Sequence, residues 1–104
     1  MAQSDRYRVV VSDRAVEMLV SCARFLANVS EQAAEELVTA FSEKAASLQQ
    51  LPERCPWMDS AYIPKRKYRK LTLAETYLMI YQIKGDAVYI DYVLDCRQDY
   101  RWLL

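Results

Sequence analysis

The apolar residues of this chain repeat with one period before about residue 50 and with another after it. Between residues 13 and 48 they recur every three or four positions, which is the spacing of an amphipathic helix. Between residues 68 and 94 they form short runs rich in β-branched and aromatic side chains, which suit a pleated sheet. After a first short strand, the chain is therefore expected to place its helices and then a run of strands.

The first half predicts two helices joined by a tight connection. Ser12 suits an N-cap and Asp13 complements the helix dipole, so the first helix should run from there to about Asn28. Ser30 suits the cap of a second helix, which is expected to end before Pro52. Two amphipathic helices with so short a connection form a helical hairpin.

Four short segments are expected to be strands: RYRVVVS (6–12), YRKLTL (68–73), TYLMIYQI (76–83) and AVYIDYVL (87–94). The last of these alternates regularly, so that every second side chain should share a face. The residues expected on one face are Val88, Ile90, Tyr92 and Leu94. The only glycine, Gly85, lies in the KGD turn before this strand, where a tight hairpin needs a positive φ.

These elements predict an α+β fold with the order β-α-α-β-β-β. A mostly antiparallel four-stranded sheet should carry the helical hairpin on one face. The chain of 104 residues is expected to form a single domain over residues 1–104. Residues 51–67 contain all three prolines and are expected to form a loop. The strand tyrosines are expected to pack within the sheet rather than to bind bases; they are Tyr77, Tyr81, Tyr89 and Tyr92.

Composition excludes several kinds of site. Histidine is absent, which removes zinc sites built on imidazole and proton transfer by histidine. The three cysteines, Cys22, Cys55 and Cys96, are odd in number and far apart, which favours free thiols in a reducing compartment. The polar first residues predict no signal peptide, and no apolar run approaches the roughly 20 residues of a membrane span. We expect a cytoplasmic protein with no cofactor and no metal.

Charge is segregated along the chain although the totals balance, with 14 basic and 14 acidic residues. Residues 13–53 hold seven acidic and three basic side chains, whereas residues 54–104 hold nine basic and six acidic ones. The densest stretch is YIPKRKYRK (62–70), which contains Lys65, Arg66, Lys67, Arg69 and Lys70. Such a stretch fits a face that binds an acidic partner, including a nucleic-acid backbone. The alternative is a set of charges that solvates an edge strand.

The ordered elements resemble the RelE/ParE superfamily, the toxins of bacterial type II toxin–antitoxin pairs. YRVVVSDRAVEML resembles the opening strand and helix start of this family. FSEKAASLQQLPERCPW is similar to its second helix and the leucine–proline turn after it. The C-terminal part resembles the family's closing strands, including Tyr77, Tyr81 and the sequence Arg97-x-Asp99-Tyr100. The resemblance runs from about residue 7 to residue 104.

The resemblance implies one of two activities on one fold. RelE-like members cleave messenger RNA in the ribosome, whereas ParE-like members poison DNA gyrase and need no nuclease residues. By position, the resemblance implies Arg69, Arg97 and Tyr100 as the candidate catalytic residues of an RNA-cleaving member. Leu71 and Leu78 stand where relatives carry cations, and Asp95 stands where many carry histidine. These departures weaken the stabilisation of transition-state charge that cleavage requires.

The leading hypothesis is a toxin that inhibits growth by binding gyrase or the ribosome and that a cognate antitoxin neutralises in a hetero-oligomer. One alternative is a ribosome-dependent mRNA endonuclease of the RelE type. The other is an inactive member that serves only as a protein-binding module. The residues interpreted as target- or antitoxin-binding are Lys65, Arg66, Lys67, Lys70 and Trp57. Whether Trp57 and Trp102 belong to a core or an interface is left open by the sequence.

Overall fold

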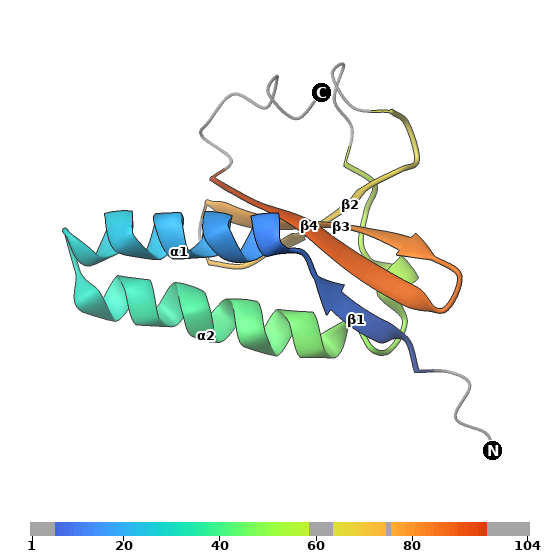
Figure 1. Cartoon of the computed structure of the whole chain (residues 1–104), viewed down its shortest axis with the longest axis horizontal. Coiled ribbons are helices and arrows are strands. Elements are labelled where there is room, and N and C mark those ends of the chain that lie inside the picture. Colours follow the sequence, from blue (N-terminus) through green and yellow to red (C-terminus); the bar gives the residue numbers. More distant parts are fainter. Residues whose placement is uncertain (1–5, 59–63, 75, 96–104) are drawn as a thin grey trace.

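The computed structural model describes residues 6–58, 64–74 and 76–95. Its elements are β1 (Arg8–Val11), α1 (Asp13–Ala27), α2 (Glu31–Ser47), the 3₁₀ helix η2 (Pro52–Arg54), β2 (Arg69–Thr72), β3 (Tyr77–Lys84) and β4 (Ala87–Asp95). This order confirms the predicted β-α-α-β-β-β arrangement. Figure 1 shows the two helices lying side by side along one side of the sheet. Neither helix in the described residues is long and apolar enough to cross a membrane.

Both helices begin at the serines predicted to cap them. The Ser12 Oγ accepts a hydrogen bond from the backbone N–H of Ala15 at 3.0 Å. The Ser30 Oγ accepts one from the backbone N–H of Ala33 at 3.1 Å. Each serine satisfies one of the amides that a helix start leaves without an intrahelical partner. The two caps fix where each arm of the hairpin begins.

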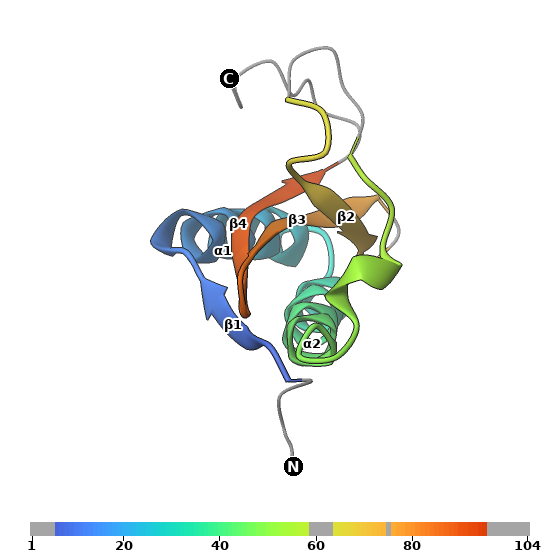
Figure 2. The same cartoon turned by 90° about the vertical axis from the view of Figure 1, so that its right-hand side faces the viewer.

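The sheet is mixed, with strand order β1-β4-β3-β2. β1 runs parallel to β4, with Val9 opposite Val88, and the β3–β4 and β2–β3 pairings are antiparallel. The parallel pairing follows from the connection, because the helical hairpin is the crossover between β1 and the other strands. Gly85 has a φ of 61° in the turn between β3 and β4, as predicted for that hairpin. Figure 2 shows β1 at one edge of the sheet and β2 toward the other.

β4 contains a β-bulge at Asp91. Ile80 pairs with Tyr92, but the next residue of β3, Tyr81, pairs with Ile90, so Asp91 is the extra residue. An extra residue reverses the alternation of side chains beyond it. The Gln82 Nε2 donates a hydrogen bond to the Asp91 Oδ2 at 2.7 Å, which links the two strands beside the bulge.

The bulge makes one prediction wrong. Val88 and Ile90 do share a face, in the core beneath the helices, but Tyr92 and Leu94 belong to a cluster on the other face. Val93, predicted to point the other way, lies in the helix-side core instead. Strict alternation fails here because two residues of β4 oppose one residue of β3.

The sheet has a packed cluster on each face. The helix-side core includes Leu37, Phe41 and Leu48 of the hairpin region, all buried, against Met79 and Tyr81 of β3. The opposite cluster is smaller. Its buried members are Met58, Ile80, Tyr92 and Leu94, with Tyr68 and Leu78 packed against them. Of the four strand tyrosines, Tyr77, Tyr81 and Tyr92 are buried in these clusters, as predicted, whereas Tyr89 is half-buried and belongs to neither cluster.

The proline-rich loop is anchored to the edge of the sheet. The backbone N–H of Met58 donates to the carbonyl of Tyr68 at 2.8 Å, and that of Lys70 donates to the carbonyl of Pro56 at 3.1 Å. These bonds align residues 56–58 with residues 68–70, next to β2. The loop therefore brings Trp57 to the strand that carries the basic residues.

Candidate functional site

The basic cluster (Lys65, Arg66, Lys67 and Lys70) lies where the loop enters β2. Lys65, Arg66 and Lys67 form a turn, and Lys70 is the second residue of the strand. All four side chains are exposed. Arg66 adopts a left-handed backbone with a φ of 58°, which is uncommon for a residue with a side chain. The structure thus brings four of the five predicted cations into one exposed segment.

A row of cations and aromatic rings connects this cluster to the start of α1. The Lys67 Nζ lies 5.3 Å from the centroid of the Tyr68 ring. The Tyr68 ring meets the Tyr92 ring edge-on, with centroids 5.8 Å apart and planes at 71°. At the far end, the Arg14 guanidinium lies 5.1 Å from the Tyr92 ring centroid and its Nη1 donates to the Tyr92 hydroxyl at 2.7 Å. These distances are within the range of cation–π and edge-to-face contacts.

The electrostatics of this row keep Tyr68 neutral. Burial, followed by the negative charge of Asp91, raises the pKa of Tyr68 to about 12. Its hydroxyl therefore stays protonated at neutral pH, and its ring serves as an apolar and quadrupolar surface. The formal charges of the row come only from Arg14 and Lys67, at its two ends. With its pKa raised, the Tyr68 hydroxyl is not suited to act as a general base near neutral pH.

Arg69 points to the other face of β2 from Lys70. It pairs with Tyr81, which belongs to the helix-side core. Its Nη1 donates to the carbonyls of Glu53 and Cys55, at 3.0 and 2.7 Å. Its guanidinium carbon lies 3.8 Å from the centroid of the Trp57 ring. The contacts observed for Arg69 thus go to the loop, and a catalytic role for this residue remains a prediction.

Trp57 is 38% exposed although Arg69 stacks on its ring. The structure thus places it at the surface rather than in either core. It stands directly opposite Arg69 across an isolated bridge, on the outer side of β2. An exposed tryptophan held rigid in this way is a common anchor for protein partners.

The remaining predicted catalytic residues, Arg97 and Tyr100, lie outside the described residues, as do Trp102 and Cys96. Leu71 packs against the helix-side core, and Leu78 packs against the opposite cluster. Each leucine therefore has a packing function in this fold. The described part of the chain shows no group of three side chains suited to hold a metal ion.

Arg14 is the site residue that sequence reasoning missed. It lies 78 positions from Tyr92, and the two meet only because β1 places the start of α1 beside β4. In the sequence it is an arginine in the first turn of a helix, where a cation opposes the helix dipole. In the sequence alone, this unfavourable position is only a weak indication that Arg14 has a function. It becomes informative once Tyr92 is known to be the partner of Arg14.

Comparison with known proteins gives a family and a fold. The family model described as "ParE toxin of type II toxin-antitoxin system, parDE" matches residues 9–100. A search of curated proteins gave no match. One similar solved structure is titled "Chromosomal ParDE TA system from P. aeruginosa". It shares 19% sequence identity and a TM-score of 0.67, covering 86% of this chain and 95% of that one.

Proposed function

The chain belongs to the family of ParE toxins of type II toxin–antitoxin systems, and from that premise we propose that it inhibits bacterial growth by binding DNA gyrase and that a cognate antitoxin neutralises it. The family model spans residues 9–100, which include every described strand of the sheet except Arg8, the first residue of β1. The activity is therefore assigned to the domain as a whole, with its binding surface at the basic cluster and Trp57.

The observation that carries this proposal is the combination of exposed cations and exposed tryptophan along one edge of the sheet. Lys65, Arg66, Lys67 and Lys70 are all exposed, and Trp57 lies at the same edge of the sheet, where it pairs with Arg69 rather than with Lys70. A rigid aromatic anchor beside several cations is typical of surfaces that bind acidic partners. Gyrase, as a DNA-bound enzyme, and an acidic antitoxin segment both fit this description.

Binding rather than RNA cleavage is the mode that the site favours. Cleavage requires cations placed around the phosphate and a group that activates the 2′-hydroxyl. Leu71 and Leu78 are partly buried against the two clusters, Arg69 contacts loop carbonyls, and the pKa of Tyr68 is too high for a base. A ribosome-dependent endonuclease would therefore depend on Arg97 and Tyr100 with little support from the described strands.

The test begins with growth. Induced alone in a bacterial host, the protein should slow growth, and co-expression of the product of a neighbouring short antitoxin reading frame should restore it. The purified toxin should then inhibit supercoiling by gyrase, and the antitoxin should relieve the inhibition. Normal growth at verified expression levels would instead support the inactive binding module.

A second experiment distinguishes gyrase from the ribosome as the target. Toxin added to programmed ribosomes should produce no codon-position cuts in a primer-extension assay. Cuts that disappear in Arg97→Ala would reject gyrase binding as the mechanism and establish the endonuclease. Loss of supercoiling without any cuts would support the proposal.

A further inference from the structure

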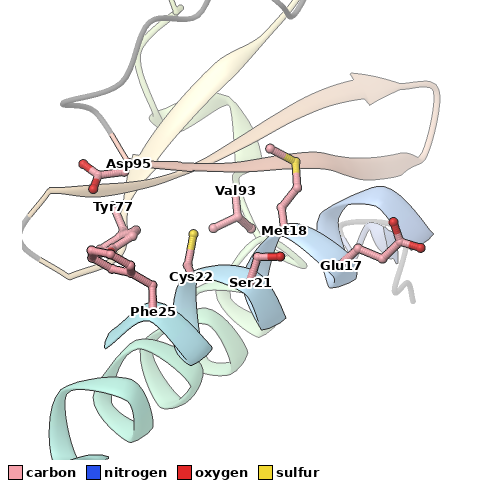
Figure 3. Close-up of a pocket in the computed structure, with 8 residues that line it drawn as sticks. All are labelled: Glu17, Met18, Ser21, Cys22, Phe25, Tyr77, Val93 and Asp95. Atoms are coloured by element: carbon pink, nitrogen blue, oxygen red, sulfur yellow. The ribbon is translucent and has the colours of Figure 1, made fainter. Parts of the chain in front are cut away.

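A pocket of about 610 Å³ lies between α1 and the ends of β3 and β4, away from the basic cluster. Helix α1 lines it with residues one turn apart, and the sheet completes it with Tyr77, Val93 and Asp95 (Figure 3). The α1 residues are Glu17, Met18, Ser21, Cys22 and Phe25. The volume is within the range of natural ligand sites. We call this space the α1–sheet pocket.

Part of the lining of the α1–sheet pocket is apolar. Tyr77 and Val93 are buried beneath it, whereas Phe25 is 62% exposed at its rim. In Figure 3 the Cys22 sulfur points toward the sheet between the aromatic side chains and Val93. A large exposed aromatic beside a hollow is costly in water and favourable once a ligand covers it.

The charge of the α1–sheet pocket is negative. Glu17 and Asp95 lie at opposite ends of the lining in Figure 3, and the described lining contains no lysine or arginine. The Asp95 side chain is nearly buried, at 9% exposure. Burial, together with the charge of Asp95, raises the pKa of the Cys22 thiol, which is consistent with a negative potential inside the pocket. A carboxylate accepts several hydrogen bonds, so Asp95 can serve a ligand beside its contacts within the protein.

We propose that the α1–sheet pocket binds a peptide segment of a partner protein that inserts an arginine side chain flanked by large apolar residues. The guanidinium would reach a carboxylate at one end of the pocket, and it would stack on Phe25 or Tyr77 on the way. The neighbouring apolar residues would cover Phe25 and Met18. Neither an acidic segment nor a nucleic-acid backbone fits, because Glu17 and Asp95 would repel them.

This surface is distinct from the basic cluster in position and in sign. Lys70 lies on the face of β2 opposite to the helices, whereas the α1–sheet pocket lies on the helix side. A partner with both an acidic and an arginine-bearing segment could therefore occupy both surfaces of one molecule. The proposal does not depend on which cellular target the toxin binds.

The probe is an acetylated, amidated pentapeptide with leucine, phenylalanine, arginine, phenylalanine and leucine in that order. Its matched control carries citrulline, which has nearly the shape of arginine without the charge. Titrated into the full-length protein, the arginine peptide should shift the NMR amide signals of Met18, Cys22 and Phe25. The citrulline peptide should bind about tenfold more weakly, since a hydrogen bond to a charged group is lost.

Variants of the protein locate the effect. Glu17→Gln and Phe25→Ala alter exposed side chains, so the fold should survive. Each substitution should lower the affinity for the arginine peptide several-fold. Glu35→Gln, an exposed carboxylate on α2 outside the pocket, should bind as the wild type does. Three results would each overturn the proposal. They are equal affinity for the two peptides, a loss of affinity in Glu35→Gln as large as in the pocket variants, and the absence of NMR shifts in α1.

Discussion

The guanidinium of Arg69 and the indole of Trp57 stack at 3.8 Å across the bridge that joins the proline-rich loop to β2. The same guanidinium donates to two loop carbonyls, those of Glu53 and Cys55. One side chain thus fixes the loop and orients the exposed tryptophan. The contacts that stabilise the loop therefore also hold Trp57 in place on the binding surface that we propose.

Arg69→Ala should lower the free energy of unfolding by about 1–3 kcal/mol, because the part-buried Cys55 carbonyl and the exposed Glu53 carbonyl both lose a charged donor. Urea denaturation measures the change. Lys70→Ala, next in sequence but exposed, should stay within about 0.5 kcal/mol of wild type. Equal effects of the two substitutions would show that the Arg69 contacts do not anchor the loop.

Replacing Lys65, Lys67 and Lys70 together by alanine should leave the Tm nearly unchanged, because exposed charges contribute little to stability. It should weaken binding to gyrase or antitoxin by about tenfold and flatten the dependence of affinity on salt. The measurement is affinity against salt concentration. The matched control is Arg8, Arg24 and Lys84 to alanine, three exposed cations outside the cluster. If affinity depended on salt in the same way in both triple variants, the basic cluster would only solvate an edge strand.

Stability should fall as the pH rises from 10 toward 12, and Tyr68 should account for part of the fall. In the folded protein the pKa of Tyr68 is raised to about 12, above its ordinary value of 10, chiefly by burial. The unfolded chain therefore loses this proton first, and alkaline pH favours unfolding. Urea midpoints between pH 8 and pH 11.5 should decline less steeply in Tyr68→Phe than in wild type. A decline of unchanged slope would mean that Tyr68 titrates normally.

Leu51 holds a left-handed backbone, with a φ of 49°, immediately before Pro52, and its side chain is 71% exposed. A side chain in this conformation costs on the order of 1 kcal/mol, which glycine avoids. Leu51→Gly should therefore be more stable than Leu51→Ala by up to about 1 kcal/mol, since alanine keeps the Cβ. Thermal and urea unfolding of the pair test this. Greater stability of the alanine variant would show that the turn is not strained at this residue.

Much of the fold could be read from the sequence because its signals are local. Capping serines at Ser12 and Ser30, the helical period of residues 13–48 and the glycine at Gly85 each act within a few positions. Local backbone preference and the burial of one helical stripe are sufficient to specify such elements. The family resemblance, drawn from the same ordered elements, is confirmed by the match over residues 9–100. The density of cations at residues 65–70 was also visible without a structure.

What the sequence could not determine depends on contacts between distant residues. The parallel pairing of β1 with β4 and the bond from Arg14 to Tyr92 each require residues about 80 positions apart to meet, and the bulge at Asp91 depends on how β4 pairs with β3. An alternating pattern does not reveal an inserted residue, because the bulge is defined only by the strand opposite. The direction in which Arg69 points was likewise decided by the loop that packs beside it. The sequence by itself determined the elements and the charge that they carry, whereas tertiary packing decided which face of the sheet each of those charges occupies.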